Sequence, residues 1–162
     1  MVVLTVGNNV LKRIWSGLKI RRGLRRAGIK QYRDFHCPDG MGGQYTVDRL
    51  ILRPDGISVL LYMRYEGNIF CGENIDHWTQ MLGGKSYSFT NPLTMLDYQV
   101  AAVKALVPGI DVDGYLFFDH RAHFPKGKAE RVIQLDNMPD SLLNRSGRPD
   151  DKLMSAWKKL RP

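Results

Sequence analysis

The sequence has few cysteines, no long apolar run and, over its first fifth, no acidic residue. The two cysteines, Cys37 and Cys71, have a spacing that matches neither a disulfide framework nor a paired zinc motif. No apolar stretch approaches the roughly 20 residues that cross a bilayer, and the first residues lack the leading charges of a signal peptide. We therefore expect a single cytoplasmic domain without an integral membrane segment.

Acidic residues are missing from residues 1–33, which carry nine lysines and arginines. The rest of the chain is nearly neutral, with 15 basic and 16 acidic residues. Single-sign clusters of this density are typical of surfaces that bind polyanions. The residues predicted to contact nucleic acid are Lys12, Arg13, Lys19, Arg21, Arg22, Arg25, Arg26 and Lys30. The alternatives are a solvated basic helix and a surface for a protein partner or a homo-oligomer.

The apolar residues of this segment do not stay on one helical face. Leu11, Ile14, Trp15 and Leu18 share a face at helical spacing, which is more typical of a core contact than of a docking site. The later apolar positions move to the opposite face, so the pattern predicts a break near Gly17. We expect residues 1–33 to form a helical segment packed on a domain of residues 34–162. A helix lying on an anionic membrane surface is a third alternative.

The remaining pattern predicts a mixed α/β domain with helices on both faces of one sheet. Residues 36–45 read as a loop, and residues 47–53 and 57–65 as strands around a Pro-Asp-Gly turn. Further strands are predicted at 66–72, 113–119 and 131–135, with helices at 91–107 and 150–160. Asn91 and Pro92 are suited to the N-cap and first position of the central helix.

Four pieces of the chain, in this order, resemble the nuclease-related domain family, called NERD. They are VDRLILRPDGISVL, YEGNIFCG, HWTQ and FTNPL, and the resemblance covers roughly residues 17 to 145. It implies a fold similar to that of the restriction-endonuclease-like PD-(D/E)xK nucleases. In those enzymes carboxylates position magnesium, and a lysine helps to activate the attacking water.

The resemblance also identifies where this sequence departs from the nuclease pattern. Asp48 matches the first carboxylate of the family, whereas Leu61 and Met63 occupy the Glu and Lys positions, and Met95 occupies a Gln position. Asp48 is expected to face Leu61 and Met63, and such aliphatic side chains favour a dry core over a hydrated ion site. Asp48 is therefore predicted to be vestigial, with a structural role or a polar contact at the end of the sheet, and no metal cofactor is expected.

A relocated active site is the alternative that would preserve metal-dependent cleavage. Asp48, Glu66 and Glu73 could supply carboxylates for magnesium, and Arg64 could replace the lysine. Strand alternation, however, points Arg64 away from Met63. We therefore predict a catalytically degenerate domain that binds nucleic acid, with an active nuclease or a protein-interaction adaptor as the other possibilities.

Overall fold

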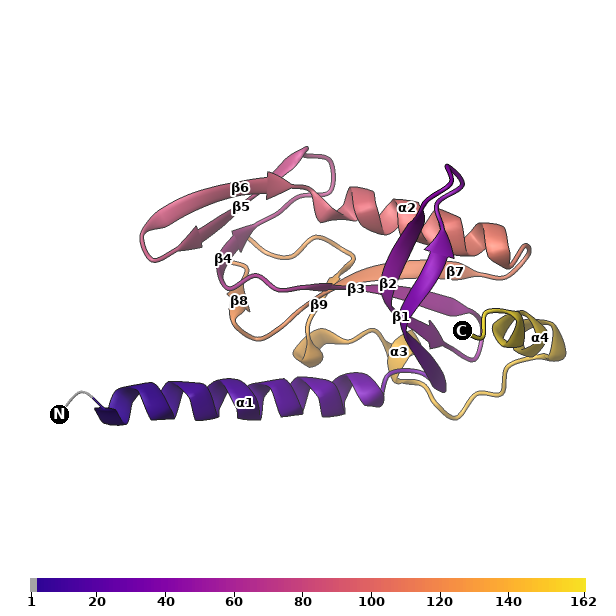
Figure 1. Cartoon of the computed structure of the whole chain (residues 1–162), viewed down its shortest axis with the longest axis horizontal. Coiled ribbons are helices and arrows are strands. Elements are labelled where there is room, and N and C mark those ends of the chain that lie inside the picture. Colours follow the sequence, from indigo (N-terminus) through magenta and orange to yellow (C-terminus); the bar gives the residue numbers. More distant parts are fainter. Residues whose placement is uncertain (1–2) are drawn as a thin grey trace.

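The computed structural model describes residues 3–162 and shows a mixed α/β fold with two sheets and helices on both faces of the larger one (Figure 1). The helices are α1 (Val3–Arg25), α2 (Pro92–Leu106), α3 (Asp140–Leu143) and α4 (Asp151–Lys159), with a 3₁₀ turn, η1 (Leu135–Asn137). The strands are β1 (Lys30–Pro38), β2 (Gln44–Leu52), β3 (Ile57–Met63), β4 (Gly67–Phe70), β5 (His77–Leu82), β6 (Lys85–Thr90), β7 (Val112–Phe118), β8 (Ala122–His123) and β9 (Val132–Ile133).

The larger sheet has the strand order β1-β2-β3-β7-β9. Its first three strands are antiparallel, and β3, β7 and β9 are parallel. Strand β3 is apolar along most of its length because it lies in the middle of this sheet and is covered on both sides. The predicted mixed sheet between helices, similar to the restriction-endonuclease-like fold, is confirmed.

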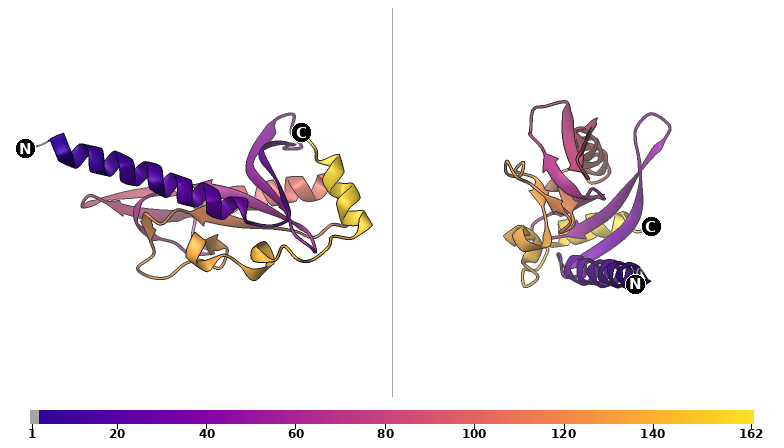
Figure 2. Two further views of the ribbon diagram at one scale, coloured as in Figure 1. Left: turned by 90° about the horizontal axis from the view of Figure 1, so that it is seen from below. Right: turned by 90° about the vertical axis from the view of Figure 1, so that its left-hand side faces the viewer.

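Two apolar clusters cover the two faces of the larger sheet. The first cluster contains residues of α2, α4 and the smaller sheet, among them Leu96, Trp157 and Trp78. The second contains Ile20 and Leu24 of α1 together with residues of α3 and the sheet. Helix α1 therefore covers the face opposite to α2 and α4, as both views in Figure 2 also show.

The N-terminal helix differs from the prediction in both continuity and length. It runs without a break through Gly17. A Cβ atom placed on this glycine would meet no atom from another part of the molecule within 4 Å. The helix ends at Arg25, the chain turns through Gly28, whose φ of 65° is left-handed, and Lys30 already begins strand β1. The predicted helical segment of residues 1–33 is therefore wrong at its C-terminal end, and its first two residues lie outside the described part of the chain.

The predicted core face of α1 is also wrong. Leu11, Ile14, Trp15 and Leu18 are 56%, 54%, 68% and 48% exposed, whereas Ile20 and Leu24 are buried. The change of apolar face needs no break because the exposed stripe lies on the side of α1 opposite to the buried Ile20 and Leu24, along the outer edge of the molecule (Figure 1).

A second sheet, with the order β6-β5-β4-β8, was not predicted. Its β5–β6 hairpin is largely exposed and polar, so it lacks the apolar alternation that indicates a strand. Helix α2 begins as predicted, because the Asn91 side chain accepts a hydrogen bond from the backbone N–H of Leu93 (2.9 Å). Among the described helices, none is both long and apolar enough to cross a bilayer.

Candidate functional site

Asp48 lies where the pairing of β2 with β3 ends. The last paired residues are Arg49 and Leu60, and beyond them the Asp48 carboxylate accepts a hydrogen bond from the backbone N–H of Tyr62 (2.7 Å). This bond satisfies a strand N–H that the ladder leaves without a carbonyl partner. Asp48 thus makes a polar contact at the end of the β2–β3 ladder, in the middle of β2, and its vestigial role stays a prediction.

Around Asp48 opens a polar cleft between α1 and the larger sheet, with a volume of about 570 Å³. We call it the arginine cleft. It is lined by Gly17, Ile20, Arg21, Leu24, Arg33, Asp34, Asp48, Arg49, Tyr62, Arg64 and Arg121. Five guanidinium groups thus surround two carboxylates, which gives the cleft an excess of positive charge.

A backbone distortion in β1 directs two of these side chains into the cleft. Asp34 has a φ of 48°, the one left-handed non-glycine residue in the described chain, and the β1–β2 pairing skips it. Tyr32 and Phe35, three residues apart, consequently both face the first apolar cluster. Arg33 and Asp34 then both face the cleft, which regular alternation would forbid. Strained backbone of this kind is concentrated at functional sites.

The same irregularity crosses to β2. Val47 and Leu50, also three residues apart, both belong to the first apolar cluster. Asp48 and Arg49, which stand between them, both line the arginine cleft. Arg33, Asp34, Asp48 and Arg49 therefore come from a stretch where two neighbouring strands depart from strict alternation.

Arg49 is half-buried among charges of both signs in the cleft. Burial is the main cause that lowers the pKa of its guanidinium, and the charge of Arg33 lowers it further, while the nearby Asp34 and Asp48 act in the opposite direction. Its guanidinium donates a hydrogen bond to the Gln31 side chain (2.9 Å), a neutral partner. An anion in the cleft would give the Arg49 guanidinium a hydrogen-bonded partner of opposite charge.

An ion pair between Asp119 and Arg121 lies at one side of the cleft. Asp119, almost completely buried at the end of β7, accepts hydrogen bonds from the Arg121 guanidinium at 2.7 to 3.3 Å. Burial raises the pKa of Asp119, but the hydrogen bonds and charge of Arg121 outweigh it, so its pKa lies below the usual value. Arg121 also approaches Glu66 (3.6 Å). Burial, followed by the charge of Asp119, raises the pKa of Tyr62.

Leu61 and Met63 do not lie in the cleft with Asp48. Both are half-buried and pack against the first apolar cluster, on the α2 side of the sheet. Tyr62 and Arg64 alternate away from them, as predicted, and this alternation places them beside Asp48. The expectation that Asp48 faces Leu61 and Met63 was wrong because the alternation of β2 is broken between Val47 and Leu50. Their correspondence to the Glu and Lys positions of the family remains a prediction.

The alternative magnesium ligands are not brought together. Glu66 approaches Arg121, and the Glu73 carboxylate accepts a hydrogen bond from the backbone N–H of Glu130 (2.7 Å). Within residues 3–162 no three His, Cys, Asp or Glu side chains form a group suited to a metal ion. One Asp48 oxygen is already bonded to Tyr62, and five guanidinium groups share the cleft. This donor set does not fit magnesium, which prefers several oxygen ligands.

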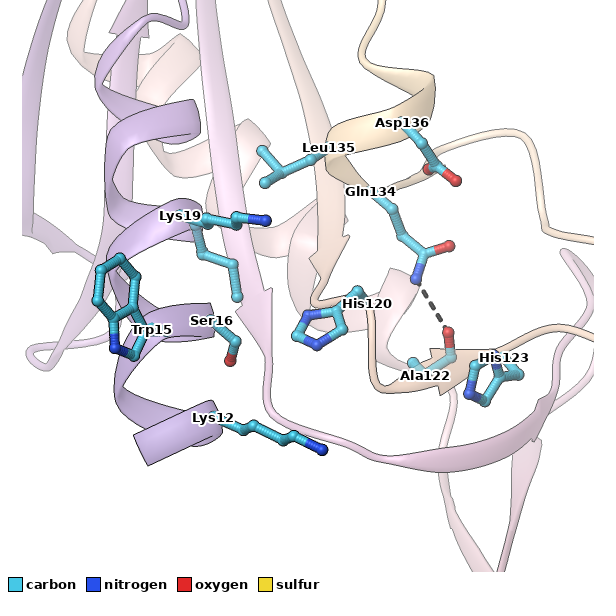
Figure 3. Close-up of a pocket in the computed structure, with 11 residues that line it drawn as sticks. Lys12, Trp15, Ser16, Lys19, His120, Ala122, His123, Gln134, Leu135 and Asp136 are labelled. Atoms are coloured by element: carbon cyan, nitrogen blue, oxygen red, sulfur yellow. Dashed lines mark hydrogen bonds between the residues drawn. The ribbon is translucent and has the colours of Figure 1, made fainter. Parts of the chain in front are cut away.

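All eight residues predicted to contact nucleic acid are exposed. Arg21 lines the arginine cleft, and Lys12 and Arg13 line a smaller pocket that also contains Arg121. Lys12 and Lys19 line a further cavity of about 740 Å³ between α1 and the segment around η1 (Figure 3). Lys30 lies on β1 and lines none of these three cavities.

Sequence reasoning missed several charged residues of the site. Arg33, Arg49 and Arg121 were not predicted, and Arg64 was considered only as a substitute for a catalytic lysine. The run Phe-Phe-Asp-His-Arg at 117–121 offered one signal, because a carboxylate that directly follows an apolar strand often lies at the sheet edge with a nearby cation.

Comparison with known proteins agrees with this geometry at the level of the family. The family model described as the nuclease-related domain matches residues 11–119, which include α1 from Leu11 onward, β1 to β7, α2 and Asp119. Neither a curated protein nor a solved structure matches the chain. The match spans well over half of the sequence, and the chain therefore belongs to the nuclease-related domain (NERD) family.

Proposed function

We propose that this NERD domain binds nucleic acid without cleaving it and that the arginine cleft holds the phosphate backbone. The observation that carries the proposal is the composition of the cleft: five arginines and two aspartates surround the position where the family resemblance expects a metal-binding carboxylate. Arginine suits phosphate because its planar guanidinium donates two parallel hydrogen bonds to neighbouring oxygens.

The exposed arginines of α1 extend this cationic surface. Arg21 lines the cleft, and the charge of Arg25 already acts on Arg49 inside it. Arg22 and Arg26 are exposed on the same helical turns. A nucleic acid strand bound in the cleft would thus meet Arg21 at the helix and could reach the neighbouring arginines around it, and such clustered cations are the typical electrostatic footprint of a nucleic-acid-binding protein.

The same geometry argues against hydrolysis. Metal-dependent phosphodiester cleavage requires carboxylates that hold the ion and a group that activates water. Here the carboxylates of Asp119 and Glu66 are engaged by Arg121, and Leu61 and Met63 pack on the opposite side of the sheet from Asp48. The cleft can attract a phosphate, but it offers no assembled set of ligands for an ion.

Binding is tested by fluorescence anisotropy with labelled single-stranded DNA, double-stranded DNA and RNA over a series of salt concentrations. We expect an affinity that falls steeply with salt, because phosphate contacts release counterions. The variant Arg33→Gln with Arg64→Gln removes two exposed cleft arginines. Its log–log salt slope should be smaller by roughly 1.4 to 1.8, at about 0.7 to 0.9 per lost phosphate contact.

A matched control removes the same charge from a different surface. Lys158→Gln with Lys159→Gln alters two exposed residues of α4, which packs on the sheet face opposite to α1. We expect this control to keep the salt slope of the wild type. The quadruple change of Arg21, Arg22, Arg25 and Arg26 to Ala should abolish binding while the fold is retained. Equal losses in the cleft variant and the α4 control would refute the cleft as the binding site.

A further inference from the structure

The middle of α1 carries an apolar stripe that the nucleic-acid surface does not use. Leu11, Ile14, Trp15 and Leu18 are between 48% and 68% exposed, and both Ile14 and Trp15 are three or four residues from Leu11 and from Leu18. They therefore share one face of the helix. On that face the next residues along the axis are Arg22 and Arg25, which are also exposed.

The stripe lies on the outer side of α1, and Trp15 at its edge also lines the cavity between α1 and the η1 segment. Ile20 and Leu24, on the opposite face of α1, are the residues buried against the sheet and α3. In Figure 1 and in the right-hand view of Figure 2, α1 forms one edge of the molecule, with no other element on its outer side. The outer face of α1 is thus a convex ridge of about 35 Å, at 1.5 Å per residue over its length, that can lie against a flat surface.

We propose that this ridge docks on an anionic lipid surface, with the Leu11–Leu18 stripe inserted at the headgroup boundary and the arginines that follow it held over lipid phosphates. Exposed Leu, Ile and Trp on one face together with flanking Lys and Arg are the features of helices that lie in a membrane interface. The charge of the segment complements this surface, because residues 1–33 contain nine cations and no anion.

The same charge argues against a second copy of the chain as the occupant. Two such helices packed side by side in parallel would place cations against cations, with no acidic residue on either to pair them. An antiparallel pair would bring the two stripes together, but it would leave the cations of each helix without an acidic partner on the other, since α1 contains no Asp or Glu. Nucleic acid suits the arginines, but it offers no apolar surface to cover Leu11, Ile14 and Leu18.

The experiment uses the full chain with vesicles of phosphatidylcholine alone or with phosphatidylglycerol added. Co-sedimentation is expected only with the anionic vesicles. Trp15 provides a direct signal, because Trp78 and Trp157, the other two tryptophans, are buried. Its emission should shift to the blue on binding, and brominated lipid should quench it. Trp15→Phe should keep the co-sedimentation and lose both signals.

The variant Leu11→Gln with Leu18→Gln removes apolar surface from two exposed positions and retains all charges. We expect its affinity for anionic vesicles to fall about tenfold or more, given the transfer free energy of two leucine side chains. Met95→Gln with Leu106→Gln is the matched control, since both residues are exposed on α2 across the molecule. This control should bind vesicles like the wild type.

Several outcomes would overturn the membrane proposal. The first is that the wild type does not associate with vesicles, and the second is that Leu11→Gln with Leu18→Gln binds vesicles as well as the wild type does. The third is that this variant keeps vesicle binding but loses oligonucleotide binding or a dimer. The proposal stands apart from the nucleic-acid function. Arg33→Gln with Arg64→Gln, which lie on the sheet side of the cleft, should lower oligonucleotide affinity and leave vesicle binding unchanged.

Discussion

Replacing Asp48 should change stability and nucleic-acid affinity in opposite directions. The carboxylate accepts the Tyr62 backbone N–H at 2.7 Å and is one of two acids among five arginines in the cleft. Asp48→Ala leaves a partly buried N–H without its acceptor, which should cost about 1–3 kcal/mol of unfolding free energy. The same variant makes the cleft more positive, so it should bind oligonucleotides more tightly.

Asp48→Asn separates the two effects. Its amide oxygen can still accept the Tyr62 N–H, so its unfolding free energy should stay within about 0.5 kcal/mol of the wild type. The negative charge is nevertheless lost. For a phosphate about 6 Å away in water, one unit charge is worth about 0.7 kcal/mol, which corresponds to roughly a threefold gain in affinity. Both variants should therefore gain affinity, and only the alanine variant should lose stability.

The assays are urea unfolding followed by circular dichroism, and anisotropy with a labelled oligonucleotide at fixed salt. Asp76→Asn serves as the control, because Asp76 is an exposed residue of the loop between β4 and β5 and lines none of the cavities around α1. It should alter neither quantity. An Asp48→Asn protein that binds more weakly than the wild type would refute the electrostatic account of the cleft.

Three further predictions concern the surroundings of the cleft. Because the pKa of folded Asp119 is lowered, its ionised carboxylate stabilises the fold above the ordinary aspartate pKa of about 3.9, and this stabilisation is lost as pH falls through the lower folded value. The free energy of unfolding should therefore fall with a different slope below about pH 4 in the wild type and in Asp119→Asn, and parallel curves would contradict this. Burial raises the pKa of the Cys37 thiol, so a disulfide reagent at neutral pH should modify it only after unfolding; rapid modification of the native protein at this residue, located by mass spectrometry, would show that the site is open. Leu61→Glu with Met63→Lys should lower the unfolding free energy by roughly 1–3 kcal/mol, because it places charges against the first apolar cluster; magnesium should restore none of it, and recovery with magnesium in thermal unfolding would mean that these residues do face Asp48.

The sequence was most informative where one physical signal dominated. The apolar run of β3 predicted a central strand, and Asn91 with Pro92 predicted the start of α2, because burial and capping leave local patterns. Strand β1 was missed because most of its residues are polar and exposed or half-buried, and only Phe35 and Cys37 are buried. A strand at the edge of a sheet shows a weak pattern of this kind.

The arginine cleft itself could not be predicted from local spacing. Its residues come from α1, from three strands and from the segment after β7, so no single stretch contains the set. The left-handed Asp34 and the broken alternation between Val47 and Leu50 decide which side chains face the cleft, and neither has a clear sequence signal. Strict period-two alternation was the assumption that placed Asp48 beside Leu61 and Met63.

The most direct test measures binding and cleavage in one sample. The wild-type protein is incubated with labelled single- and double-stranded oligonucleotides and with magnesium or manganese, and each sample is run on a native and on a denaturing gel. We expect a retarded complex on the native gel and full-length oligonucleotide on the denaturing gel, with the complex weakened by Arg33→Gln together with Arg64→Gln. Metal-dependent shortening of the oligonucleotide that disappears in Asp48→Asn would contradict the central claim and identify Asp48 as a catalytic carboxylate.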